Sequence, residues 1–280
     1  MNNKGIRTLT WVVQPSEAAV YSIEAFLRER GCSHHVLTHL KRTDHGILLN
    51  GEWAYANQRV CPGDTITVRL EETDTSSHIL PVQLPLSIIY EDDDILIIDK
   101  PSDMPVHPSI GNYENTLANA VMYYYASREI PFVFRCVTRL DRDTTGLAVI
   151  AKNMLSSAIL SAMSAKRQIH REYLAITEGV LPAEGTIDAP IARQEDSVLM
   201  RCVDYKNGER AVTHYRSLGY YIGSDSIQPL PSELTLASVR LETGRTHQIR
   251  VHMKSIGHPL PGDFLYNPES VCALAQRQML

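Results

Sequence analysis

The sequence predicts a protein of mixed helices and strands that is divided into two unequal domains. Its 280 residues are more than one small hydrophobic core usually organises. Segments with apolar residues at helical spacing are interspersed with short apolar runs, and these runs are bounded by Asn-Gly and Pro-Gly turns. With 44% hydrophobic and 21% charged residues, the composition is ordinary for a soluble globular protein.

Several protein classes are disfavoured by simple features of the chain. No apolar run approaches the roughly 20 residues of a membrane span, and the N-terminus lacks the apolar core of a signal peptide. The five cysteines are scattered and form no Cys-x-x-Cys pair, so neither a zinc ribbon nor a disulfide framework is indicated. A net charge of −5 argues against a general polyanion binder. We therefore expect a monomeric cytoplasmic protein without a membrane partner.

Residues 1–73 are predicted to form a small α/β module. Helical spacing predicts one helix over 17–30, capped by Ser16, and a second over 35–42. Strands are expected at 47–49 and 65–70, next to Asn-Gly and Pro-Gly-Asp turns.

A linker at 74–86 is expected to separate this module from a second domain at 87–280. The linker is polar and then interrupted by Pro81 and Pro85. In the second domain, strands are predicted over 95–98, 147–151, 171–177 and 234–241, helices over 117–128, 153–167 and around 249–256, and a final helical stretch beyond 264. Asn207-Gly208 predicts a hairpin between strands at 200–205 and 211–218.

An unusual charge cluster lies directly before the strand at 147–151. Arg139, Asp141, Arg142 and Asp143 fall within five positions. Between residues 135 and 175 there are seven basic residues against three acidic ones, and contacts to phosphates need only such a local patch. A strand that follows directly would hold the cluster rigidly, as a reactive site requires. The alternative is a salt-bridged surface turn.

Common catalytic motifs are missing from the sequence. It contains no phosphate loop, no Gly-x-Gly-x-x-Gly fingerprint after a strand and no Gly-x-Ser-x-Gly elbow. His247 and His252 lack the spacing of a zinc hydrolase motif. We therefore interpret them as hydrogen-bonded polar residues near a helix and not as metal ligands. A metal-dependent hydrolase that uses these two histidines is the weakest of the functional hypotheses.

Three motifs, in order along the chain, resemble those of the RluA-type pseudouridine synthases. The first is Thr-Arg-Leu-Asp-Arg-Asp-Thr-Thr-Gly-Leu at 138–147, where the family usually has His in place of Thr138. The second is Arg-Glu-Tyr-Leu-Ala at 171–175, and the third is Gly-Arg-Thr-His-Gln-Ile-Arg-Val-His at 244–252. Shorter matches lie at 99–102, 106–109, 257–259 and 262–263. The resemblance runs from about residue 88 to the end of the chain and implies an α+β fold with a long mixed, largely antiparallel sheet.

The resemblance also implies roles for individual residues in converting uridine to pseudouridine. Asp141 would be the nucleophile, kept ionised by Arg250, and Tyr173 would stack against the flipped uracil. Arg139 would fill the space that the base leaves. The remaining candidates for RNA contacts in this domain are Arg142, Lys166, Arg167, Arg171, Arg245 and His247. Since the reaction involves no redox step and no external energy, no cofactor and no metal are implied.

The N-terminal module is similar to the small RNA-binding domain named after a ribosomal protein of the small subunit. That similarity implies that the second helix and its following turn lie against RNA, with Lys41 and Arg42 among the contacts. The module carries few basic residues for such a role. Its alternative role is a structural lid. In either role we expect the module to be attached flexibly to the second domain.

Two functions remain as competing hypotheses. The first is a pseudouridine synthase acting on structured RNA, with large-subunit ribosomal RNA favoured and transfer RNA second. The second is a non-catalytic RNA-binding or ribosome-assembly factor derived from the same fold. Relatives usually continue beyond the final Met279-Leu280 into a further strand pair, so the C-terminus is expected to be truncated.

Overall fold

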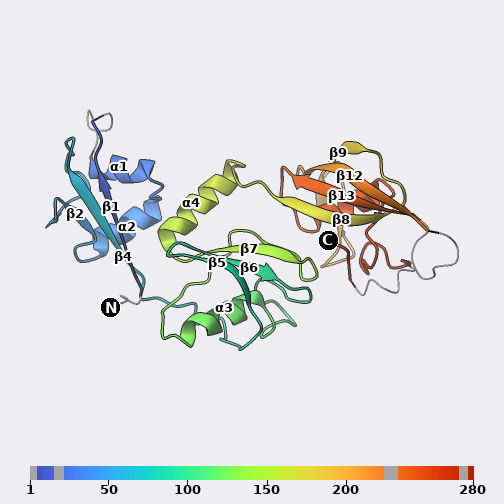
Figure 1. Cartoon of the computed structure of the whole chain (residues 1–280), viewed down its shortest axis with the longest axis horizontal. Coiled ribbons are helices and arrows are strands. Elements are labelled where there is room, and N and C mark those ends of the chain that lie inside the picture. The colour runs from blue at the N-terminus through green and yellow to red at the C-terminus, as the bar shows by residue number, and fades with distance from the viewer. Residues whose placement is uncertain (1–4, 16–21, 224–232, 271–276) are drawn as a thin grey trace. The chain divides into compact units, whose positions relative to one another are not determined.

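The computed structural model describes residues 5–15, 22–223, 233–270 and 277–280 (Figure 1). The chain divides into two compact units. The first contains Met1–Leu140 and Gly146–Lys166, and the second contains Asp141–Thr145 and Arg167–Leu280. The five residues 141–145 thus belong to the second unit although both of their flanking segments belong to the first. Within the described ranges, no helix has the length and apolar character of a membrane span.

The N-terminal part of the first unit is an antiparallel sheet with two helices (Figure 1). In sheet order its strands are β1 (Ile6–Val12), β4 (Thr65–Glu71), β2 (Ile47–Leu49) and β3 (Glu52–Trp53), and its helices are α1 (Ile23–Glu29) and α2 (His34–Arg42). Asn50 and Gly51 both have positive φ, at 54° and 87°, so the predicted Asn-Gly turn is present and joins β2 to β3.

The start of the first helix differs from its prediction. α1 begins at Ile23, and the Ser22 hydroxyl accepts the N–H of Ala25 as its N-cap. The predicted cap, Ser16, lies outside the described residues. Gly31 follows the helix with φ of 90°, the left-handed conformation that ends helices.

The rest of the first unit is built on a second antiparallel sheet, of order β5-β6-β7. Its strands are β5 (Ser87–Glu91), β6 (Ile95–Lys100) and β7 (Gly146–Ala151), and its helices are α3 (Leu117–Ala126) and α4 (Met154–Ala165). Leu96, Ile98 and Ile150 are fully buried, as the continuous apolar runs predict. The predicted cap Asn153 accepts the N–H groups of Leu155 and Ser156 through its side chain.

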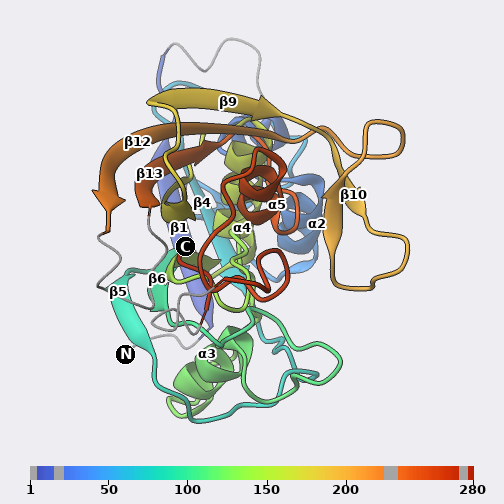
Figure 2. The ribbon, with the colours of Figure 1, turned by 90° about the vertical axis from the view of Figure 1, so that its right-hand side faces the viewer.

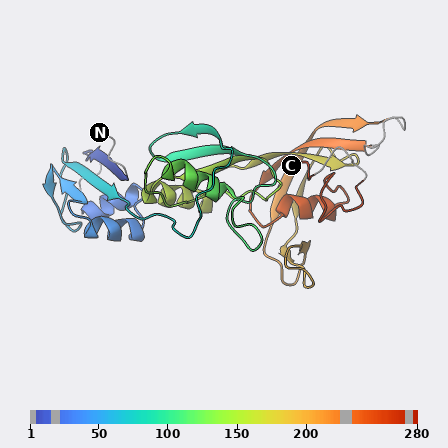
Figure 3. The same cartoon turned by 90° about the horizontal axis from the view of Figure 1, so that it is seen from below.

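The second unit is an antiparallel sheet of order β8-β13-β12-β9, with α5 packed against one face (Figure 2, Figure 3). Its elements are β8 (Glu172–Glu178), β9 (Glu184–Asp188), β10 (Ile191–Arg193), β11 (Arg201–Val203), β12 (Val212–Ile222), β13 (Glu233–Leu241) and α5 (Gln248–Ser255). The core lies between Ile249 and Met253 of α5 and Ala175, Ala237 and Val239 of the sheet.

The predicted hairpin around Asn207-Gly208 is wrong. A turn is present, because the Asp204 carboxylate accepts the N–H groups of Lys206 and Asn207. Its flanking strands do not pair with each other, however. β11 pairs with β10, while β12 pairs with β13 and β9. β12 pairs with β13 at nine positions and with β9 at five, and these long-range pairings prevail over the local turn signal.

The α+β class is confirmed by this architecture. Every strand pairing among the described residues is antiparallel, and the strands of the predicted catalytic domain lie in separate sheets in place of one long mixed sheet. The predicted final helical stretch falls partly on residues 271–276, outside the described ranges. Residues 277–280 run beside β8, where the N–H of Ile176 donates to the carbonyl of Met279.

Candidate active site

The second unit brings Asp141 and Arg250 together, although they are 109 positions apart in sequence. Nη1 of Arg250 lies 3.3 Å from Oδ2 of Asp141. The Asp141 side chain keeps 25% of its surface exposed, whereas that of Arg250 keeps 7%. A partly exposed carboxylate beside a buried cation is an arrangement in which the anion can reach a ligand while the cation stays fixed.

Hydrogen bonds of Thr144 and Thr145 fix the short segment that carries Asp141. The N–H of Thr144 donates to the carbonyl of Asp141 at 3.2 Å, which closes the turn. The Thr144 hydroxyl is buried and accepts a hydrogen bond of 2.7 Å from the amide of Gln278. The N–H of Thr145 donates to the carbonyl of Leu280. These contacts explain why 141–145 groups with the second unit.

Arg250 is oriented by a buried carboxylate that was not among the predicted site residues. Nε and Nη2 of Arg250 each lie 2.7 Å from an oxygen of Asp263, in the two-pronged geometry that matches a guanidinium to a carboxylate. Burial acts to lower the pKa of Arg250, but the hydrogen bonds and charge of Asp263 and the charge of Asp141 raise it above its ordinary value. Arg250 therefore stays positively charged while buried.

The helix α5 is positioned by the residue at its first turn. Gln248 is 2% exposed, and its carbonyl oxygen accepts the Arg245 N–H at 3.0 Å and the Thr243 hydroxyl at 2.8 Å. Its amide donates to the carbonyl of Val212 and to the hydroxyl of Thr213. Because the buried Gln248 side chain is hydrogen-bonded at both its oxygen and its nitrogen, it anchors the start of α5 to β12, and Arg250 follows two positions later.

The loop after α5 completes the environment of Arg250. Oδ1 of Asp263 also accepts the N–H groups of Leu265 and Tyr266. The Tyr266 ring lies 4.9 Å from Cζ of Arg250, and its hydroxyl lies 2.8 Å from Nδ1 of His247. Asp263 and Tyr266 were missed as site residues because they lie in an irregular loop with no periodic signal. The Gly262-Asp263 match to the family was the one available clue.

His247, which contacts the Tyr266 hydroxyl, has a strained backbone conformation. It precedes α5 with φ of 58°, a left-handed conformation that is uncommon for residues other than glycine. Burial lowers the pKa of His247, the charge of Asp141 opposes that shift, and the charge of Arg250 adds to it. The predicted site residue His247 thus lies in the electrostatic field of the Asp141–Arg250 pair.

Tyr173 of β8 is also close enough to Asp141 to be affected by its charge. The ring packs against the apolar core that α5 shares with the sheet, opposite Val239 in the strand register. Burial raises the pKa of the Tyr173 phenol, Arg171 opposes the shift and Asp141 adds to it. The structure thus brings Asp141, Arg250, Tyr173 and His247 into one electrostatic neighbourhood.

The other predicted substrate-binding residues of the second unit lie at its surface in ordinary polar contacts. Arg245 donates to the carbonyl of Arg210 and pairs with Glu209, and Arg142 donates to Asp143 at 3.2 Å. The guanidinium of Arg171 lies against Gly244, where a Cβ would meet Nη1 at 2.3 Å. A side chain at position 244 would therefore displace the tip of Arg171 from this position.

The remaining candidates belong to the first unit. Arg139 is exposed, and its charge lowers the pKa of His107 in addition to the larger effect of burial. In the N-terminal module, Lys41 pairs with Glu24 at 2.6 Å and Arg42 is exposed.

The contacts of His252 bear on the metal-hydrolase hypothesis. Its Nδ1 lies 2.8 Å from the hydroxyl of Thr213, and its Nε2 lies 2.8 Å from the carbonyl of Ala189. Both ring nitrogens therefore have protein partners. In the described ranges, no group of three or more His, Cys, Asp or Glu side chains is arranged to hold a metal ion.

Comparison with known proteins connects this geometry to one family. A family model described as RNA pseudouridylate synthase matches residues 94–255. An uncharacterized RNA pseudouridine synthase of Bacillus subtilis is 35% identical over 88% of this chain and 83% of its own length. The ribosomal large subunit pseudouridine synthases D of Haemophilus ducreyi and Escherichia coli K12 are 41% and 40% identical over 79% and 80% of this chain. The chain spans 63% and 65% of those two relatives.

A solved structure supports the fold independently. The human RNA pseudouridylate synthase domain containing 1 aligns with a TM-score of 0.57 and 25% identity. The alignment covers 70% of this chain and 75% of the human one.

Proposed function

Because the chain belongs to the RNA pseudouridylate synthase family, we propose that it is an isomerase that converts uridine to pseudouridine in structured RNA. Large-subunit ribosomal RNA is the favoured substrate, since two similar proteins are named ribosomal large subunit pseudouridine synthase D. The single observation that supports the activity most strongly is the 3.3 Å contact between Asp141 and an Arg250 whose other nitrogens are held by Asp263. We place the protein in the cytoplasm, with RNA as its partner.

In this proposal Asp141 is the nucleophile. A carboxylate attacks only in its ionised form, and the guanidinium of Arg250 lies 3.3 Å from this one. Within the described part of the chain, Oδ1 of Asp141 accepts no hydrogen bond, so one oxygen remains available to a substrate. Asp141 forms a covalent bond to the substrate, the bond between uracil nitrogen and ribose carbon breaks, and the base turns. A carbon–carbon bond then forms and the bond to Asp141 breaks, which regenerates the carboxylate. The proton lost from the base carbon is matched by one gained at the freed ring nitrogen. No electron leaves or enters.

Tyr173 and the arginines would receive the flipped nucleotide. Burial keeps the Tyr173 phenol neutral, which suits a ring that stacks against uracil, a contact worth about 1–3 kcal/mol. Arg139 would occupy the space that the base vacates. Phosphate contacts are assigned to Arg142, Lys166, Arg167 and Arg171, with Arg245 and His247 beside the nucleotide. Lys41 and Arg42 of the N-terminal module would bind a more distant part of the RNA.

The proposal is tested by comparing Asp141→Asn with Asp143→Asn, two changes at carboxylates two positions apart. Asp143 pairs with Arg142 and has no assigned role in the chemistry. Pseudouridine is mapped in ribosomal and transfer RNA after incubation with each protein, and RNA binding is measured in parallel. Asp141→Asn should abolish pseudouridine while retaining RNA binding, and Asp143→Asn should keep most of the activity. A wild type that binds RNA but forms no pseudouridine would instead support the non-catalytic RNA-binding factor.

A further inference from the structure

The N-terminal module is connected to the middle sheet of the first unit by far more than a linker. The connecting segment is hydrogen-bonded along its length. The N–H of Ser76 donates to the carbonyl of Phe132, and the Ser76 hydroxyl accepts the N–H of Phe134. Further along, Ile79 is 4% exposed and packs in the hydrophobic core of the middle sheet. The proline-containing segment that the sequence predicts as a linker is therefore fixed to the domain that follows it.

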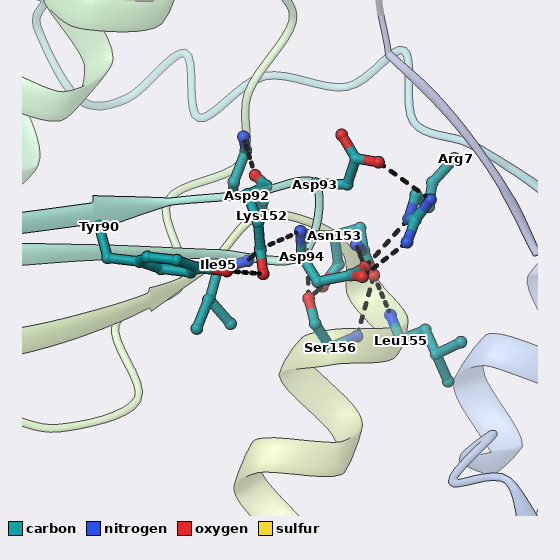
Figure 4. Close-up of polar contacts among 10 residues, drawn as sticks. All are labelled: Arg7, Tyr90, Asp92, Asp93, Asp94, Ile95, Lys152, Asn153, Leu155 and Ser156. Atoms are coloured by element: carbon teal, nitrogen blue, oxygen red, sulfur yellow. Dashed lines mark hydrogen bonds and ion pairs between the residues drawn. The ribbon is translucent and has the colours of Figure 1, made fainter.

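A second connection runs from β1 to the first turn of α4 (Figure 4). Nε and Nη2 of Arg7 donate to the two carboxylate oxygens of Asp94, at 3.1 and 2.7 Å. Asp94 in turn accepts the side-chain amide of Asn153 at 2.8 Å. That contact fixes which end of the Asn153 amide faces the helix, so its oxygen caps α4. Arg7 is thereby connected to the cap of α4 through a single carboxylate.

A third connection starts where β4 ends. Glu72 follows β4, and one of its oxygens accepts the N–H of Met154, the first residue of α4, at 2.5 Å. The other oxygen pairs with Arg135, which lies on the segment leading to β7. A carboxylate at the N-terminus of a helix is stabilised by the exposed N–H groups there. Asp94 and Glu72 thus approach the same helix end from the two parts of the unit.

The apolar contacts follow the same route. Leu155 of α4 is buried in the hydrophobic core of the N-terminal module, with Met154, Ala158 and Ile159 packed beside it. At Gly31, an added Cβ would lie 2.4 Å from Cγ1 of Ile159, so the turn after α1 packs directly against this side chain of α4. The core of the module is therefore completed by a helix of the neighbouring domain.

We propose that the N-terminal module and the middle sheet form one rigid body, locked at the first turn of α4 by Arg7–Asp94–Asn153 and by Glu72. With these contacts in place, the N-terminal module is an RNA-binding surface held at a fixed position relative to the middle sheet. The exposed positions of α2, His34, His35, Lys41 and Arg42, keep a constant geometry with respect to Arg139 and the middle sheet. The partner is a structured RNA that touches both faces at once. This role in RNA binding rests on the proposed function, whereas the rigidity does not.

Rigidity has a defined consequence for such an RNA. When one face has bound, the second binds as an intramolecular step whose effective concentration is highest if the spacing is already correct. Loosening the lock removes that advantage without removing a single RNA-contacting residue. Affinity for a long RNA should therefore fall, whereas affinity for a short RNA that covers one face should not.

The rigidity is measured by residual dipolar couplings of the full-length protein. Couplings from β1 and β4 and those from β6 and β7 should fit one alignment tensor in the wild type. In the double variant R7A/E72A each pair should fit well by itself, with two different tensors. The control is Arg69→Ala, which removes an arginine that pairs with Glu71 on its own strand and should keep the common tensor. Two tensors in the wild type, or one tensor in the double variant, would overturn the lock.

The role in RNA binding is measured by titrating the same proteins with a long fragment of large-subunit ribosomal RNA and with a short hairpin cut from it. The double variant should bind the long fragment about tenfold more weakly, and Arg69→Ala should bind like the wild type. Equal affinity of wild type and double variant for the long fragment would refute the fixed RNA-binding surface. A wild type that forms no pseudouridine but shows one tensor and this affinity difference would refute the proposed activity alone.

Discussion

Two arginines of this protein each contact two carboxylates, and their surroundings differ. Arg7 contacts Asp93 and Asp94 with 28% of its side chain exposed, whereas Arg250 contacts Asp141 and Asp263 with 7% exposed. Water can replace a lost partner at Arg7 but reaches Arg250 far less. The same pair chemistry therefore gives a connection of modest strength in the first unit and a fixed cation in the second.

The difference also separates the two carboxylates of the candidate site. Asp263 is fully buried and receives both prongs of Arg250, whereas Asp141 is 25% exposed and receives one longer contact. One carboxylate holds the cation in place, and the other is left partly free to react. A single arginine can serve both purposes only because its nitrogens point in different directions.

The largest expected effect is that of Asp263→Ala. Removing the buried partner leaves the buried Arg250 with only its single longer contact to Asp141. Breaking a buried ion pair in this way destabilises a protein by about 3–5 kcal/mol. Hydrogen exchange of amides in α5 and β13 as a function of urea should report this loss. Asp141→Ala is the matched comparison and should cost less than about 1 kcal/mol, because its contact is longer and partly exposed. Equal losses for the two variants would contradict the division of roles.

Asp94→Ala should have a smaller and salt-dependent effect. Its contacts to Arg7 and Asn153 are partly exposed, so we expect a loss of about 1 kcal/mol in the protection of β1 and β4 amides. At 1 M salt the screening length falls to about 3 Å, and the difference from the wild type should shrink. The Asp263→Ala effect should persist at the same salt concentration. An Asp94→Ala variant with the same amide protection as the wild type would indicate that packing at Leu155, and not charge, holds the module.

Features that depend on residues close together in the sequence could be predicted, whereas features that depend on distant residues could not. The β7 strand, the β2–β3 turn and the Asn153 cap depend on neighbouring residues, and all three are confirmed. The hairpin at Asn207-Gly208 failed because pairing depends on strands far along the chain.

The two arginine contacts illustrate the same limit. Arg7 and Asp94 are 87 positions apart, and no local pattern connects them. Arg250 and Asp263 are 13 positions apart, but they are joined by an irregular loop without a period. The Asp141–Arg250 pair was predicted only because the family motifs name both residues. Physical pattern alone left Asp141 in a surface turn.

Acid should weaken the connection at Arg7 within a defined pH range. The hydrogen bond from Arg7 lowers the pKa of Asp94, burial opposes the shift, and the Asn153 amide adds to it. A lowered folded-state pKa stabilises the fold above the unfolded value of about 3.9, and this stability is lost as the pH falls through the folded pKa. Amide protection in β1 and β4 should therefore be constant from pH 7 to about 5 and decrease below about pH 4.

The Arg7→Ala variant is the control for this acid sensitivity. It removes the first cause of the shift while leaving Asp92, Asp93 and Asn153 around Asp94 unchanged. The decrease below about pH 4 should be shallower in this variant than in the wild type. An identical pH dependence would show that another carboxylate with a lowered pKa, such as Asp92, is responsible.

The smallest effect is expected at His247, whose imidazole should also make the stability of the second unit depend on pH. Burial lowers the pKa of His247, the charge of Asp141 opposes this shift, and the charges of Arg250 and Arg201 add to it. A lowered histidine pKa means that the unfolded chain binds the proton more readily. Stability is therefore full above about pH 6.5 and declines as the pH falls below it. The imidazole resonance of His247 should titrate below about pH 6.5, and Asp141→Asn should move its midpoint lower still, because an opposing charge is lost. A midpoint that does not respond to Asp141→Asn would place His247 outside the field of that carboxylate.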